Sequence, residues 1–74
     1  MSDDKLVMMA NQIGKFFVPQ RNADPAAAIA THIRKFWDPR MRAAIVAHLD
    51  KGGEGLEVPV RQAILRLKEG QTPR

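Results

Sequence analysis

Residues 34–42 read RKFWDPRMR and contain the strongest determinant of the fold, the pair Asp38-Pro39. An aspartate side chain accepts hydrogen bonds from the free N–H groups at the start of a helix, and proline suits the first helical position. We therefore expect one helix to end at Trp37 and the next to begin at Pro39, with a stiff corner and no loop between them. The same dipeptide recurs at residues 24–25 and predicts another helix start there.

Apolar residues recur at spacings of three and four along the chain, which is typical of helices with one buried face. Glycine and proline divide this pattern into four segments, and no stretch of useful length alternates as a strand would. The expected helices run from Asp3 or Asp4 to before Pro19, from Pro25 to Phe36 or Trp37, from Pro39 to before Gly52, and from about Glu57–Pro59 to Gly70. The sequence thus predicts an all-α fold, a compact bundle of about four short helices. We expect one small domain over residues 1–74, with residues 1–4 and 71–74 frayed.

The helical stripes can share one hydrophobic core. Its predicted members are Leu6, Met9, Ile13, Phe16, Ile29, Ile33, Phe36, Met41, Ile45, Leu49, Val60, Ile64 and Leu67. Beside the first stripe, Val7, Ala10 and Gly14 form a strip that would allow another helix to approach closely. Residues 53–55 read GEG and predict a short mobile loop, after which Leu56 is expected to pack back onto the core.

Composition excludes most functional classes for this chain. It has 74 residues, a net charge of +4 and no cysteine, so it can form no disulfide, thiolate zinc site or iron–sulfur cluster. Small domains usually need such a staple or a partner, which favours a subunit or an adaptor over an enzyme that works alone. Apolar runs such as residues 6–10 are far too short to cross a membrane. An acidic start where a signal peptide would be basic leads us to expect a cytoplasmic protein.

The chain shows no set of residues for catalysis, cofactor binding or metal binding. Each of the two histidines, His32 and His48, lies beside an apolar stripe, and we interpret both as boundary residues bonded to backbone. Hydroxyl groups occur only at Ser2, Thr31 and Thr72, which makes a Ser–His–acid site very improbable. The glycine-rich stretch lacks the context of a phosphate-binding loop.

The corner segment is the one candidate site, and three interpretations stay open. In the first, Phe36 and Trp37 fill the core and the basic side chains are solvated. In the second, a protein partner binds a patch formed by Arg34, Trp37, Arg40, Met41 and Arg42, because tryptophan and arginine are enriched at interface hot spots. In the third, aromatic and basic groups bind single-stranded nucleic acid, although the basic residues do not form one stripe.

The run HIRKFWDPRMR at residues 32–42 resembles the signature of the delta subunit of soluble, NAD-dependent, molybdenum-containing formate dehydrogenases. Two further stretches are similar to that family: residues 5–13 with Phe16-Phe17, and residues 52–56 followed by Val60-Arg61 and Ala63. The resemblance covers about residues 5–67, nearly the whole chain.

This resemblance implies membership of a cytoplasmic complex whose larger subunits oxidise formate and pass electrons to NAD. Molybdopterin, iron–sulfur clusters and FMN are then expected in the partner subunits and none in this chain. We expect it to be non-catalytic by itself, to dock on the molybdenum-bearing catalytic alpha subunit, and to stabilise that subunit or help it mature. The alternatives are a small basic nucleic-acid-binding or regulatory adaptor and, less favoured, a small enzyme that acts through His32, His48 or Glu54.

Overall fold

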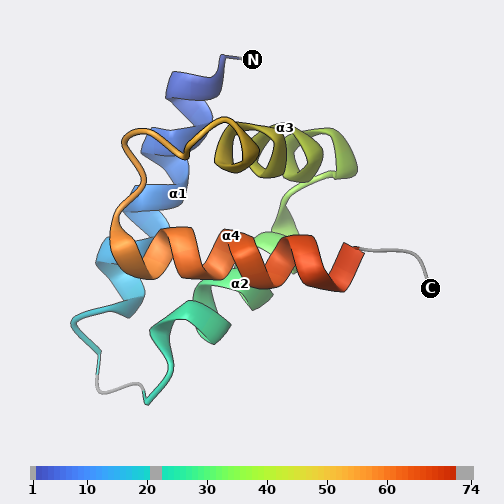
Figure 1. Ribbon diagram of the computed structural model, residues 1–74. Helices are drawn as coiled ribbons and strands as arrows, with labels where there is room; N and C mark the ends of the chain where they lie inside the picture. The colour runs from blue at the N-terminus through green and yellow to red at the C-terminus, as the bar shows by residue number, and fades with distance from the viewer. Residues whose placement is uncertain (1, 21–22, 72–74) are drawn as a thin grey trace.

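A computed structural model describes residues 2–20 and 23–71 of the chain. Figure 1 shows its four helices, α1 (Asp3–Phe17), α2 (Pro25–Phe36), α3 (Pro39–Asp50) and α4 (Val58–Gln71). α4 packs along α2 and against α3, while α1 contacts the other three helices. The prediction of an all-helical fold of four short helices is confirmed, and the described part of the chain contains no strand.

Three helix starts are capped by side chains. Asp24 Oδ1 accepts from Ala27 N at 3.2 Å and opens α2, and Asp38 Oδ1 accepts from Met41 N at 2.9 Å and opens α3. Both predicted Asp-Pro starts are therefore confirmed. Ser2 caps α1, which begins at Asp3, inside the segment that we expected to fray. Met1 and residues 72–74, the rest of the predicted frayed ends, lie outside the described residues.

The core contains most of the predicted residues, but two of the predicted members lie on the surface. Its fully buried members are Leu6, Ala10, Ala26, Ile29, Ala30, Ile33, Ile45, Val60, Ala63, Ile64 and Leu67, joined by Val7, Trp37 and Leu56 near its edge. Met9, Ile13, Met41 and Leu49 pack against it in partly buried positions. Phe16 and Phe36 were predicted inside but remain 63% and 72% exposed. Consecutive side chains in a helix point about 100° apart, so only one of Phe16 and Phe17 can face inwards. At the end of α2 the extended backbone of Trp37 turns its ring, and not that of Phe36, into the core.

Close packing of α1 on α4 depends on Gly14. A Cβ atom placed there would lie 2.6 Å from Val60 Cγ2, and Val60 is completely buried. Only a residue without a side chain therefore fits at this crossing. The expectation of a close neighbour beside this strip of α1 is confirmed.

The loop between α3 and α4 differs from the mobile segment that we predicted. Asn11 on α1 donates from Nδ2 to Gly55 O at 2.8 Å and accepts from Glu57 N at 3.2 Å. Arg61 on α4 donates to Gly53 O at 3.2 Å. Side chains from two helices thus fix the loop backbone, and Leu56 is buried as expected.

Candidate protein-docking surface

The corner between α2 and α3 is built from two extended residues. Trp37 has φ −90° and ψ 140°, and its N–H still donates to Ile33 O at 2.9 Å as the last bond of α2. Asp38 is also extended and caps α3. This geometry turns the Trp37 ring into the core, where it is only 6% exposed. Trp37 was predicted as part of a docking patch, and in the free chain its buried ring leaves little of that surface to the side chain itself.

The side chain of Arg42 links the two helices at this corner. Its Nη1 donates to Arg34 O at 3.2 Å, which ties the first turn of α3 to the last turn of α2. The Arg42 Nε is buried and has no hydrogen-bond partner among the described residues. Arg42 is therefore partly committed to holding the helices at their angle.

The other predicted patch residues point to different neighbours. Arg34 is exposed and lies against the end of α4, since a Cβ atom on Gly70 would lie 3.3 Å from its Nη2. Arg40 and Met41 instead line a hollow together with Leu6 of α1. The structure thus brings Arg40 and Met41 together but does not join all five predicted residues into one patch.

A row of rings on α1 and α2 was not foreseen from the sequence. We call the residues Phe16, Phe17, His32 and Phe36 the aromatic row. Phe16 and Phe17 meet edge to face with centroids 5.0 Å apart, and Phe17 lies 5.9 Å from the His32 ring. His32 in turn lies 4.7 Å from Phe36. The available signal was the placement of two neighbouring aromatic residues at the end of each helix.

Two open hollows flank the middle of the aromatic row. Both are lined by Phe17 and His32, which form the ridge between them. Phe16 borders the first hollow and Phe36 the second. Burying a large apolar side chain is worth about 1.5–3 kcal/mol, so each exposed phenylalanine leaves roughly 1–2 kcal/mol unrealised in the free chain. Such exposed apolar surface commonly marks a site of protein interaction.

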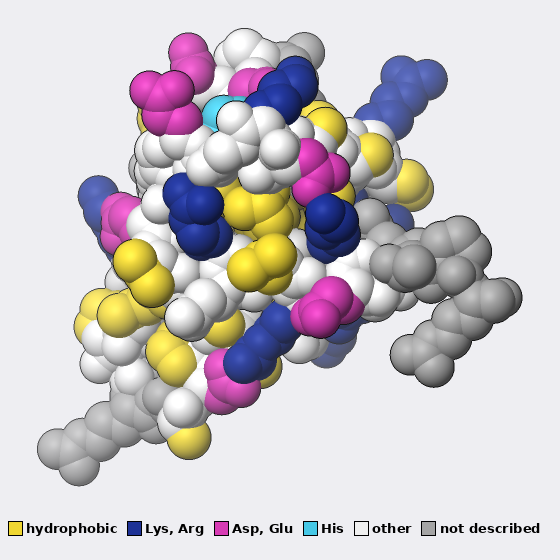
Figure 2. All heavy atoms as spheres, in the orientation of Figure 1, with side chains coloured by type: hydrophobic (Ala, Val, Ile, Leu, Met, Phe, Trp, Pro, Cys, Tyr) yellow, Lys and Arg dark blue, Asp and Glu magenta, His cyan; other side chains and the backbone are white. Residues whose placement is uncertain are grey.

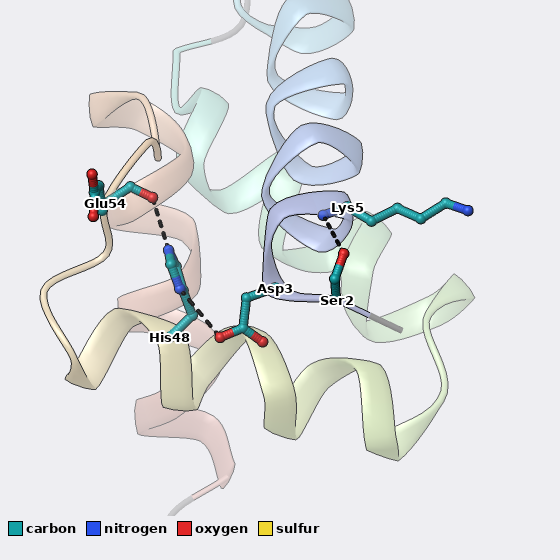
Figure 3. A network of polar contacts seen from close by, with 5 residues as sticks. All are labelled: Ser2, Asp3, Lys5, His48 and Glu54. Atoms are coloured by element: carbon teal, nitrogen blue, oxygen red, sulfur yellow. Dashed lines mark hydrogen bonds and ion pairs between the residues drawn. The ribbon is translucent and has the colours of Figure 1, made fainter.

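The two histidines have different surroundings. His48 Nε2 lies 2.8 Å from Glu54 O, so Nε2 carries the proton and donates, while Nδ1 lies 3.5 Å from Asp3 Oδ2 (Figure 3). The interpretation of His48 as a boundary residue bonded to backbone is confirmed. His32 is half-buried, as expected of a boundary residue, and its ring packs between Phe17 and Phe36; within the described residues no hydrogen bond from it to the backbone is found.

Charges of both signs alternate over the face that α3 and α4 present in Figure 2. Arg66 on α4 donates to Asp24 Oδ2 at 2.7 Å, and Lys68 pairs with Asp50. The hydrogen bond from Arg66, followed by the one from Ala27 N–H, lowers the pKa of the Asp24 carboxyl below its ordinary value. Among the residues that the structure describes, this face therefore carries no continuous basic stripe of the kind typical of nucleic-acid binding.

No cluster in the described part of the chain joins three His, Asp or Glu residues in a way that could hold a metal ion. Among residues 2–20 and 23–71, no helix has both the length and the apolar character needed to cross a membrane. The fold and the aromatic row define a small all-helical protein with an exposed apolar surface, a class that includes many subunits of larger assemblies.

The comparison with protein families is more specific. The model of the delta subunit of NADH-dependent formate dehydrogenase, FdsD, matches residues 5–64, and the chain belongs to this family. This confirms the resemblance found in the sequence. No curated protein and no solved structure matches the chain.

Proposed function

We propose that this chain is a non-catalytic accessory subunit that docks on the molybdenum-bearing catalytic subunit of a cytoplasmic formate dehydrogenase. Docking would stabilise that subunit or help it mature, and molybdopterin, iron–sulfur clusters and FMN would all reside in the larger subunits. The family match supports membership of the complex. The docking role is supported above all by the exposed aromatic row on a chain of only 74 residues.

The residue chemistry agrees with a division of labour between subunits. The chain has no cysteine for iron–sulfur ligation. Several of its polar side chains have structural tasks: Asp24 and Asp38 cap helices, and Asn11 and His48 hold the loop before α4. The fold itself therefore accounts for these groups without a role in chemistry.

Copurification and an activity assay test the proposal. A tagged chain expressed in its own cells should recover larger subunits that mass spectrometry identifies as formate dehydrogenase, with bound flavin, iron and molybdenum. Deleting the chain should lower formate-dependent NAD reduction and the molybdenum content of the catalytic subunit, and re-expression should restore both. Full activity and full molybdenum loading without the chain would refute the stabilising or maturing role.

A further inference from the structure

We propose that the aromatic row is the docking surface, and that its occupant is an amphipathic helix of the larger subunit with apolar side chains flanked by carboxylates. This inference rests on the proposed function and adds to it the surface and the chemistry of the partner. It differs from the patch predicted from the sequence, which centred on the arginines of the α2–α3 corner.

The shape of the surface suits side chains that arrive from a helix. The ridge of Phe17 and His32 separates two hollows, and Phe16 and Phe36 stand at the outer ends of the row. A helix that lies over both hollows presents apolar side chains at spacings of three, four and seven residues, and can place one in each. The hollows are open to solvent, so they fit a partner surface better than an enclosed small molecule.

The two hollows are lined by side chains of different size, so a partner helix would fit the surface better in one orientation than in the other. Met9, Ile13 and Trp37 line the first hollow with large side chains. The second hollow is lined by the short side chains of Ala27, Ala28 and Thr31, which leave room for a bulkier side chain of the partner. The rings of the row already pack against one another, so they lose little conformational freedom when a partner covers them.

The charges beside the second hollow indicate what kind of partner would bind there. Lys35 lines the second hollow and forms no ion pair within residues 2–20 and 23–71. The carboxylate that lines the same hollow, Asp24, is engaged by Arg66. An occupant with carboxylates beside its apolar side chains would therefore complement this rim and gain a charge pair with Lys35.

The same charges argue against two other occupants. A second copy of this surface would bring another Lys35 toward the first, and Asp24, the carboxylate that lines the same hollow, is already engaged by Arg66. Single-stranded nucleic acid stacks on aromatic rings but also needs a row of cations along its backbone. Of the residues that the structure describes, Lys35 is the only lysine or arginine that lines either hollow.

The experiment compares variants of the chain inside the whole enzyme. The row variant carries Phe16→Ser and Phe36→Ser, and the matched control carries Val58→Ser and Leu65→Ser, which alter two exposed apolar residues of α4. All variants are co-expressed with the larger subunits, which are purified through a tag on the catalytic subunit. The amount of bound chain is measured by quantitative mass spectrometry, and circular dichroism of each isolated variant checks that it is folded.

We expect at least a tenfold loss of the row variant from the complex, with helical content and melting close to wild type, and no loss of the control. Lys35→Glu should also weaken retention, and the loss should be largest at low salt. A separate variant with Arg34→Ala and Arg40→Ala should stay bound. A bound row variant, or loss of the arginine variant alone, would overturn the inference.

Three further results distinguish the surface, the function and the occupant from one another. If the wild-type chain copurifies and the row variant does so equally, the inference fails and the proposed function stands. If the wild-type chain itself does not copurify with formate dehydrogenase subunits, the proposed function fails. Self-association of the wild-type chain that the row variant abolishes, or oligonucleotide binding that it abolishes, would overturn the helix as occupant in favour of a second copy or a nucleic acid.

Discussion

Gly14→Ala should destabilise the protein although it replaces glycine by the best helix former. Gly14 lies inside α1, where the substitution by itself would favour the helix by about 1 kcal/mol. The added methyl group, however, would lie 2.6 Å from Val60 Cγ2 and 3.8 Å from Ile29 Cδ1. Carbon atoms in good contact are about 3.5–4.0 Å apart, so the first contact is about 1 Å too short.

The protein cannot easily relieve this short contact, so the substitution should lower the free energy of unfolding. Val60 is fully buried, and a valine in a helix has essentially one allowed rotamer, so α1 and α4 must separate. Overpacking of this kind costs about 2–3 kcal/mol, which leaves about 1–2 kcal/mol after the gain in helix propensity. For a domain of this size that corresponds to a fall in melting temperature of about 5–15 °C.

Thermal unfolding followed by circular dichroism measures this effect, and Gly70→Ala is the matched control. A Cβ atom at Gly70 would meet only the flexible end of Arg34, at 3.3 Å, so this variant should melt at or above the wild-type temperature. Val60→Ala removes buried methyl groups and costs stability in the wild type, but it should cost less in the Gly14→Ala background, with a favourable coupling of about 1 kcal/mol or more. A Gly14→Ala protein that melts as high as the Gly70→Ala control, or strict additivity with Val60→Ala, would refute the reasoning.

Three other substitutions test the loop, a helix cap and the core. Asn11→Ala should cost about 1–2 kcal/mol and speed hydrogen exchange at the Glu57 amide, because one side chain serves two backbone groups of the loop; unchanged exchange would contradict this. The pKa of Asp24 is lowered by Arg66, so its stabilisation is present above the ordinary pKa of 3.8 and lost as the pH falls through the lower folded-state value. Asp24→Asn keeps an oxygen for the cap and should flatten the acid side of a curve of melting temperature against pH, which a curve identical to wild type would disprove. Ile33→Asp places a carboxylate at a fully buried position and should abolish the helical signal, so normal melting of that variant would overturn the core assignment.

The candidate site could be predicted only in part. The corner itself was found because Asp38 acts on the helix that follows it, and its bond to Met41 N depends on nearby residues alone. The direction in which each aromatic ring points could not be predicted from such local interactions. Phe36 and Trp37 are neighbours in sequence, and the three-and-four spacing allowed either ring to face inwards. The extended backbone at Trp37 decided that its ring enters the core and left Phe36 on the surface.

The sequence by itself determined the four helices, because caps, prolines and the periodicity of apolar residues act over a few positions along the chain. The sequence also indicated the family, through residues 32–42 and the stretches around them. Only the tertiary structure decided which rings stay exposed and how the loop before α4 is held. Asn11 reaches Gly55 across 44 positions, and α1 must pack beside α2 before the aromatic row exists. Such contacts depend on where whole helices come to lie, which no local pattern specifies.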